Sequence, residues 1–266
     1  MWQGQHCIFG RSPAFPERKE AGLFFFTGCN LRCVFCQNFQ IARAEQGKEI
    51  TVERLSEIFL ELQAQKANNI NLVTATHYVP QVVEALKKAK EQGLHIPVVY
   101  NCGGYETVDT LKRLEGLVDI YLPDFKYVDT ERAKRYSHAK NYPEVAKAAL
   151  AEMVRQQPEA EFDERDIMKK GVIVRHLMLP GGIKDSKAVV KYLYETYGDQ
   201  IYISLMNQYT PLPHVAEYPE INRKVKKFEY DRLVDYAISL GVENGFIQEG
   251  ETAKESFIPA FTNEGV

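Results

Sequence analysis

The chain lacks the features that mark membrane, secreted and nucleic-acid-binding proteins. Its 266 residues contain no apolar run near the ~18 residues that a membrane-spanning helix needs. Residues 1–10 show no basic segment followed by an apolar one, as a secretory signal would. Positive charge is not in excess, because 33 Lys and Arg stand against 36 Asp and Glu, for a net charge of −3. We therefore expect no membrane partner and no nucleic-acid partner.

Cysteine is scarce and unevenly placed. The five cysteines are an odd number in a chain without a visible signal sequence, which argues against a disulfide framework and favours the reducing cytoplasm. Three of them, Cys29, Cys33 and Cys36, lie within eight residues, whereas Cys7 and Cys102 stand apart. Such a cluster of thiols in a reducing compartment indicates metal or redox chemistry.

Strand and helix patterns alternate along the chain. The composition, 45% hydrophobic and 26% charged, is that of a globular protein long enough to bury a large core. The runs at 24–26 and 98–100 are apolar at every position, as strands buried on both faces of a parallel sheet require. We expect strands at 23–27, 69–74, 96–100, 118–122, 172–179 and 200–206, and helices at 51–66, 79–92, 108–114, 142–155, 186–197 and 228–240.

Six strand–helix units predict an α/β fold, a partial (β/α)6 TIM-like barrel, through right-handed crossovers. No low-complexity linker divides them, so we expect a single domain over residues 1–266, with a core at about 21–241, an N-terminal extension at 1–20 and a C-terminal tail at 242–266. A polar excursion at 156–170 and a loop at 207–227 are expected to shape access to the barrel mouth. Ligands of such folds bind at the carboxyl ends of the strands.

The cysteine cluster follows the first predicted strand directly, with the spacing Cys29-x3-Cys33-x2-Cys36. Three thiolates from one loop can hold an iron–sulfur cluster whose fourth iron stays open to a ligand. Two alternatives are a zinc site of three cysteines with His6 or His77 as the fourth ligand, and a redox pair made by Cys33 and Cys36.

This motif, with the aromatic Phe35 before its last cysteine, resembles the radical S-adenosylmethionine (SAM) superfamily. The resemblance implies that Cys29, Cys33 and Cys36 bind a 4Fe–4S cluster and that SAM chelates the open iron. It also implies that an electron from a low-potential donor of the flavodoxin or ferredoxin type cleaves SAM. The resulting 5′-deoxyadenosyl radical abstracts a hydrogen atom from the substrate.

Downstream segments resemble the activases of glycyl radical enzymes, such as pyruvate formate-lyase activating enzyme. Asp124-Phe125-Lys126 is similar to their Asp-x-Lys motif, and Val174–Gly181 to their fifth strand, in which an arginine contacts SAM; here that is Arg175. The resemblance implies that SAM is bound by residues that follow several strands: Phe35, Asn38, Thr76, His77, Asn101, Asp124, Lys126 and Arg175.

The chain departs from the family pattern at three places. The usual Gly-Gly-Glu stretch is replaced by residues 76–80, so the amino group of SAM must be bound differently; Asn101 stands where the activases have aspartate, and residues 207–209 replace a late histidine. No second cysteine-rich segment is present, so we expect no auxiliary cluster.

These observations favour a monomeric cytoplasmic enzyme that abstracts the α-hydrogen of a glycine in a glycyl radical enzyme or another protein or peptide. The alternatives are a radical SAM enzyme acting on a small molecule or free peptide, and a non-enzymatic zinc or iron–sulfur module. Cys102 is either a hydrogen donor to a substrate radical or an ordinary buried cysteine. The lysines at 87–90 are either a solvated helix face or a docking patch for an acidic electron donor.

Overall fold

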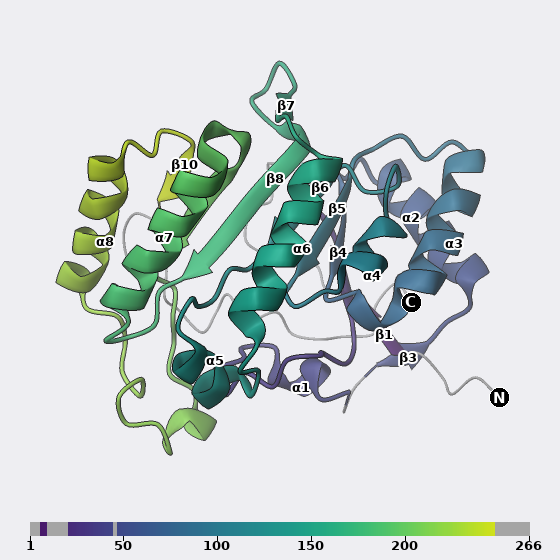
Figure 1. Cartoon of the computed structure of the whole chain (residues 1–266). Coiled ribbons are helices and arrows are strands. Elements are labelled where there is room, and N and C mark those ends of the chain that lie inside the picture. Colours follow the sequence, from purple (N-terminus) through teal and green to yellow (C-terminus); the bar gives the residue numbers. More distant parts are fainter. Residues whose placement is uncertain (1–5, 10–20, 45–46, 248–266) are drawn as a thin grey trace.

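One curved sheet organises the molecule (Figure 1). The computed structural model describes residues 6–9, 21–44 and 47–247. The strand order is β10-β9-β8-β6-β5-β4-β2-β1-β3, and neighbouring strands from β2 to β10 along this order are parallel. The antiparallel pairs β1–β2 and β1–β3 extend one side of the sheet. The strands are β1 (His6–Phe9), β2 (Gly22–Phe26), β3 (Lys48–Glu49), β4 (Ile70–Val73), β5 (Val98–Cys102), β6 (Ile120–Pro123), β7 (Glu161–Phe162), β8 (Met168–Leu177), β9 (Tyr202–Met206) and β10 (Gly245–Ile247).

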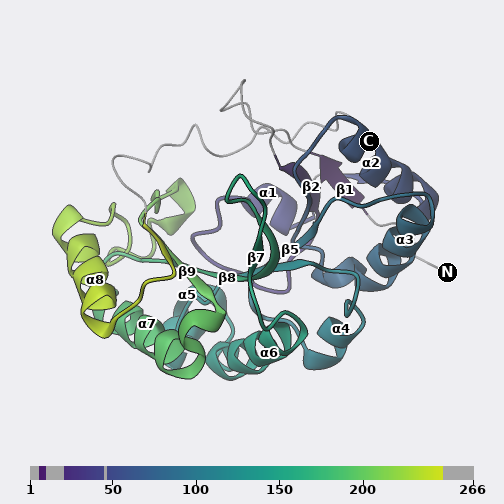
Figure 2. The ribbon, with the colours of Figure 1, turned by 90° about the horizontal axis from the view of Figure 1, so that it is seen from above.

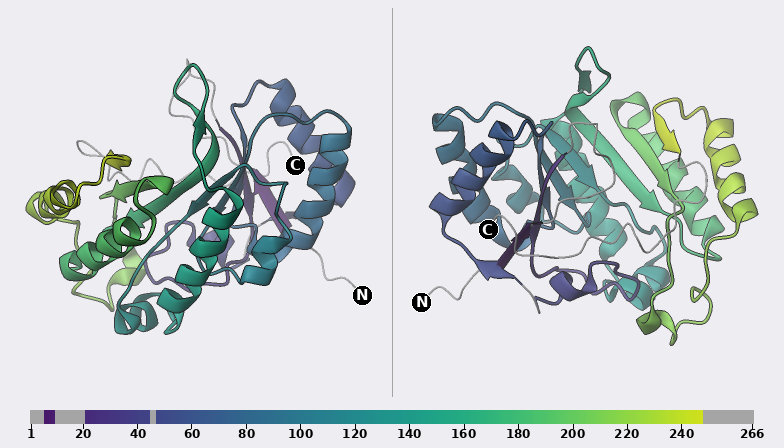
Figure 3. Two further views of the ribbon diagram at one scale, coloured as in Figure 1. Left: turned by 45° about the horizontal axis from the view of Figure 1, so that its top comes forward. Right: turned by 180° about the vertical axis from the view of Figure 1, so that it is seen from behind.

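Helices connect the parallel strands and cover the convex face of the sheet (Figure 2). Seen from behind, the strands lie in front of α4, α6 and α7 (Figure 3). The helices are α1 (Phe39–Ala42), α2 (Val52–Ala64), α3 (Val79–Glu91), α4 (Val108–Lys112), α5 (Thr130–Ser137), α6 (Tyr142–Gln156), α7 (Ile183–Tyr197) and α8 (Lys227–Leu240), with short 3-10 turns at Thr76–Tyr78, Gly198–Gln200 and Pro213–Val215.

The local sequence explains where these helices begin and what they bury. At α2 the Thr51 side chain accepts a hydrogen bond from the backbone N–H of Arg54, which caps the first turn. Leu55, Phe59 and Leu62 recur at helical spacing and are all buried against the sheet. The strands of the sheet centre, such as β4 and β5, are buried at every residue, as strands between a helix layer and a filled barrel interior must be.

The predicted α/β fold, a partial barrel, is confirmed. All six predicted strands and all six predicted helices are present, with ends displaced by a few residues. Helix α5 was not predicted, because its eight residues carry only two buried apolar side chains and give no clear periodic pattern. Within the predicted excursion at 156–170, β7 pairs with the beginning of β8. The sheet also extends past the predicted core at both ends, through β1 and β10.

The carboxyl ends of the parallel strands lie on the side of the sheet where α1 and α5 are seen in Figure 1, opposite the β7 hairpin. Every sequence-predicted site residue follows, or lies at the end of, one of these strands, apart from Arg175 inside β8. None of the helices in the described ranges is long and apolar enough to cross a membrane.

Candidate functional site

The cysteine loop runs from β2 to α1 and is held by backbone hydrogen bonds on both sides. The N–H groups of Gly28 and Cys29 donate to the carbonyls of Ile41 and Ala42 at 2.8 and 3.1 Å, which folds the loop back onto α1. From the other side, the N–H of Val34 donates to the Tyr136 carbonyl of α5 at 2.8 Å. The three thiols are therefore presented by a loop whose main chain is fixed before any ligand binds.

The three thiols are half-buried, and the negative charge of one thiolate raises the pKa of its neighbours. Burial is the main cause that raises the pKa of Cys29 to about 11 and that of Cys36 to about 12. The pKa of Cys33 is raised for the same reason, although Lys126 acts in the opposite direction, as does the hydroxyl of Ser137, 3.0 Å from the thiol. Thiolates at these positions therefore need positive charge close by, which a metal centre provides as it displaces the protons.

Three charged residues lie next to this loop: Asp124 and Lys126, which follow β6, and Arg175, which lies in β8. We call them the β6–β8 cluster. Lys126 Nζ lies 2.7 Å from Asp124 Oδ2, and Arg175 Nη2 lies 2.8 Å from Asp124 Oδ1. Although burial opposes ionisation, the two cations hold the pKa of Asp124 below its usual range. Arg175 also donates to Asn101 Oδ1 at 2.7 Å, whereas its buried Nε has no hydrogen-bond partner among the described residues.

The loops after β5 and β6 touch at Gly104. Gly104 has a φ of +75°, and a Cβ added there would lie 2.1 Å from the carbonyl oxygen of Asp124, so only glycine fits. The hydroxyl of Tyr142, from α6, lies 2.9 Å from the carbonyls of both Gly103 and Asp124 and accepts a hydrogen bond from the Lys126 N–H at 3.0 Å. Tyr142 thus fixes the main chain on which the β6–β8 cluster stands.

Two predicted residues, Thr76 and Cys102, lie at an acid that the sequence did not single out, Glu106. Thr76, in the 3-10 turn after β4, donates through its hydroxyl to Glu106 Oε1 at 2.8 Å. The thiol of Cys102 lies near the same carboxyl group, whose negative charge helps to raise the pKa of the thiol. His77 is exposed and lies beside Gly28. Glu106 follows Gly103-Gly104-Tyr105 in a loop without periodicity, and no local pattern could have distinguished it from a surface glutamate.

The remaining predicted residues lie near the start of α1. Phe35 is buried, with its ring 6.2 Å from that of Tyr209, and Gln37 donates to the Gln208 carbonyl at 3.3 Å. The segment where the activases have their late histidine therefore packs on the cysteine loop. Asn38 precedes α1 without capping it through its side chain.

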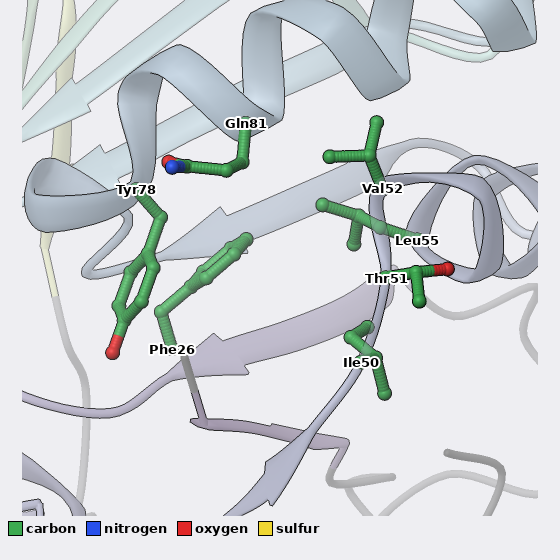
Figure 4. A pocket seen from close by; sticks show the side chains of 7 residues that line it. All are labelled: Phe26, Ile50, Thr51, Val52, Leu55, Tyr78 and Gln81. Atoms are coloured by element: carbon green, nitrogen blue, oxygen red, sulfur yellow. The ribbon is translucent and has the colours of Figure 1, made fainter. Parts of the chain in front are cut away.

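A small, partly open hollow lies beside β2 (Figure 4). The ring of Tyr78 stacks on Phe26, and the amide end of Gln81 points toward Tyr78, away from the labelled side chains of α2. None of the predicted ligand-binding residues lines it; its walls are Phe26, Ile50, Thr51, Val52, Leu55, Tyr78 and Gln81.

The donor set fits an iron–sulfur cluster better than a single zinc ion. A zinc site gathers four ligands around one ion, and among the described residues no three His, Cys, Asp or Glu side chains converge in that way. In a cluster each thiolate binds a different iron, so the thiols need only surround the cube. The side chain of His6 lies outside the description, so the zinc alternative with that ligand stays untested.

Comparisons with known proteins agree with this arrangement. The sequence model of the Radical SAM superfamily matches residues 23–181, from the first parallel strand to the loop after β8. An uncharacterized protein of Methanocaldococcus jannaschii is 30% identical over 220 residues, which is 80% of this chain and 60% of that protein. Pyruvate formate-lyase-activating enzyme of Clostridium pasteurianum is 33% identical over 41% of this chain and 47% of its own length. The chain thus spans 60% or less of these relatives' lengths.

Solved structures share the fold at low sequence identity. SuiB of Streptococcus suis, in a structure bound to S-adenosylmethionine, has a TM-score of 0.58 at 14% identity, covering 84% of this chain and 48% of SuiB. The FeFe-hydrogenase maturase HydG of Carboxydothermus hydrogenoformans has a TM-score of 0.58 at 12% identity, covering 90% and 57%. At these identities the likeness concerns the fold alone.

Proposed function

This chain belongs to the radical SAM superfamily, whose members use a 4Fe–4S cluster and SAM, and we propose that it is an activase-like enzyme that creates a glycyl radical in a partner protein. The observation that carries the proposal is the β6–β8 cluster, placed beside the cysteine loop and built from an Asp-x-Lys pair and a strand arginine. The partial match to pyruvate formate-lyase-activating enzyme supports it further.

When bound, the cluster and SAM supply a 5′-deoxyadenosyl radical that takes a hydrogen atom from the substrate. Cys29, Cys33 and Cys36 hold the cluster and release their protons as it binds. Lys126 lowers the cost of that negative charge, because its ammonium acts directly on Cys33 and is held in place by Asp124.

Arg175 and Asp124 orient SAM in this proposal. The guanidinium is fixed by Asn101 and Asp124, and its buried Nε still has a hydrogen to donate. A carboxylate or a ribose hydroxyl is the partner that such a donor requires. Phe35 would exclude water from the cysteine loop, because its ring is buried against Tyr209.

The first test is chemical. Protein reconstituted without oxygen should contain about four irons and four sulfides per chain, the content of one such cluster. With dithionite and SAM it should release 5′-deoxyadenosine and methionine in equal amounts. Fully loaded protein that releases neither would contradict the proposal.

The second test identifies the substrate class. Reduced enzyme, SAM and a candidate glycyl radical enzyme should give an electron paramagnetic resonance doublet on the partner protein, and Cys36→Ala should give none. A modified small product without a protein radical would instead favour the alternative, a radical SAM enzyme that acts on a small molecule or free peptide. The departure at residues 76–80, where the family has Gly-Gly-Glu, keeps that alternative open.

A further inference from the structure

Glu106 is a buried acid that forms no ion pair with any cation in the part of the chain that the structure describes. Its side chain is 1% exposed. Oε1 accepts a hydrogen bond from Thr76, while Oε2 is buried and has no hydrogen-bond partner among the described residues. None of the ion pairs found among those residues includes Glu106; the nearby cations Lys126 and Arg175 are paired with Asp124.

An ionised carboxylate in this position is costly unless a positive charge joins it. Burial raises the pKa of Glu106, and the negative charge of Asp124 raises it further. The surroundings are nevertheless polar, because Thr76 donates to the carboxyl group and its charge acts on the thiol of Cys102 and the buried hydroxyl of Tyr100. A polar site with one acceptor left over suits a cationic hydrogen-bond donor.

The position of Glu106 identifies that donor. Its loop touches the cysteine loop, since Asn30 Nδ2 donates to the Tyr105 carbonyl at 2.6 Å. The charge of Glu106 also acts on the thiol of Cys29. A cationic group bound at Oε2 would therefore lie next to the proposed cluster, within the part of the mouth where SAM has to bind.

We propose that Glu106 binds the ammonium group of SAM and takes over, from the loop after β5, a contact that the absent Gly-Gly-Glu stretch cannot make. The inference rests on the proposed function of the site. SAM has two cationic centres, and only the ammonium has N–H groups to donate to an unpartnered carboxylate oxygen, whereas the sulfonium has none. Thr76 positions the carboxylate by fixing Oε1, which leaves Oε2 for the ligand.

The experiment compares two ligands that differ only in the amino group. S-Adenosylhomocysteine, which lacks the sulfonium charge, and its deaminated counterpart are bound to reconstituted wild-type protein, Glu106→Gln and the control Glu115→Gln. Glu115 is an exposed carboxylate paired with Arg155, away from the mouth. Dissociation constants come from equilibrium dialysis, with iron and sulfide content measured for each protein.

Glu106→Gln should weaken S-adenosylhomocysteine binding ~10- to 100-fold, as expected for loss of a charged hydrogen bond. The same variant should change binding of the deaminated ligand less than ~2-fold, because that ligand has no ammonium to lose. Glu115→Gln should change neither constant. Equal weakening of both ligands by Glu106→Gln would overturn the inference, since the carboxylate would then only shape the site, and so would unchanged binding of both.

If Glu106→Gln fails to fold or to take up iron, Glu106→Asp keeps the charge and shortens the reach. Weakening confined to the amino-bearing ligand in that variant supports the inference, and its absence overturns it. The proposed function is judged separately. If wild-type protein cleaves SAM but Glu106→Gln still binds the amino-bearing ligand as wild type does, the inference about Glu106 is wrong and the proposed function stands. If wild-type protein with a full complement of iron and sulfide binds neither ligand, both the proposed function and the inference are wrong.

Discussion

The mouth of the partial barrel has two walls that handle buried charge in opposite ways. On the wall formed by β2, β4 and β5, the half-buried thiols and the buried Glu106 form no ion pair among the described residues, and their pKa values are raised. On the wall formed by β6 and β8, Asp124 has two cations, and its pKa is lowered. On the second wall the chain's own side chains thus balance the carboxylate, whereas on the first wall we expect the ligands to supply the positive charge.

The largest expected effect comes from breaking the first wall. Cys33→Ala should abolish SAM cleavage, because only two thiolates would remain to hold the iron–sulfur cluster and the thiol that Lys126 helps to ionise would be lost. Iron content and 5′-deoxyadenosine release measure the change. Cys7→Ala is the matched control, and loss of cleavage in that variant would show that the ligand set is assigned wrongly.

The contact between the walls is expected to be almost as sensitive. Gly104→Ala places a methyl group 2.1 Å from the Asp124 carbonyl, at a φ that alanine disfavours. We expect a loss of ~2–4 kcal/mol in the free energy of unfolding, measured by denaturant titration of the metal-free protein. Gly116→Ala is a useful comparison, because Gly116 has nearly the same φ and nothing within 4 Å of an added Cβ. Equal losses in the two variants would mean that backbone conformation, not the contact between the walls, sets the cost.

Within the second wall, Asp124→Asn should leave cluster assembly intact and weaken SAM binding ~10-fold or more, because Lys126 and Arg175 lose their common anion. The unfolding free energy should fall by ~1–3 kcal/mol, less than for a fully buried pair, since these side chains keep some exposure to water. If neither SAM affinity nor stability changes, the β6–β8 cluster is not part of the SAM-binding site.

The smallest effect, and the sharpest contrast, is expected in the pH dependence of the metal-free protein. A carboxyl group whose pKa is raised on folding lowers the stability of the protein as the pH rises from its pKa in the unfolded chain through its pKa in the folded one. The free energy of unfolding of Glu106→Gln should therefore increase relative to that of wild type over this pH interval. A carboxyl group whose pKa is lowered contributes above its unfolded pKa and loses the contribution on acidification, so the cost of Asp124→Asn should shrink at low pH. Each pKa unit corresponds to about 1.4 kcal/mol. Two profiles of the same sign, measured by thermal unfolding, would contradict the contrast.

The residues of the second wall could be predicted from the sequence. On the first wall the three cysteines could be predicted, but Glu106 could not. Alternate spacing after a strand places Asp124 and Lys126 together, and a charge within an apolar strand identifies Arg175, so the pattern carries the geometry. The three cysteines are equally local. Glu106 meets Thr76 across two loops, thirty residues apart. Such a meeting depends on the register of β4 against β5, which no short motif records.

The same limit applies to the fold. Long apolar strands and periodic helices were predictable because burial imposes their pattern on every residue. Helix α5 is short and mostly polar, yet its carbonyls hold the cysteine loop, a role that depends on main-chain position and not on side-chain type.

The hydroxyl of Tyr142 carries a single proton but lies equally close to two carbonyl groups, one in each wall. It can satisfy only one of them at a time, so the loops after β5 and β6 compete for the same hydrogen. Rotation of the O–H bond toward the Gly103 carbonyl therefore leaves the Asp124 carbonyl without this hydrogen bond, and rotation toward Asp124 does the reverse.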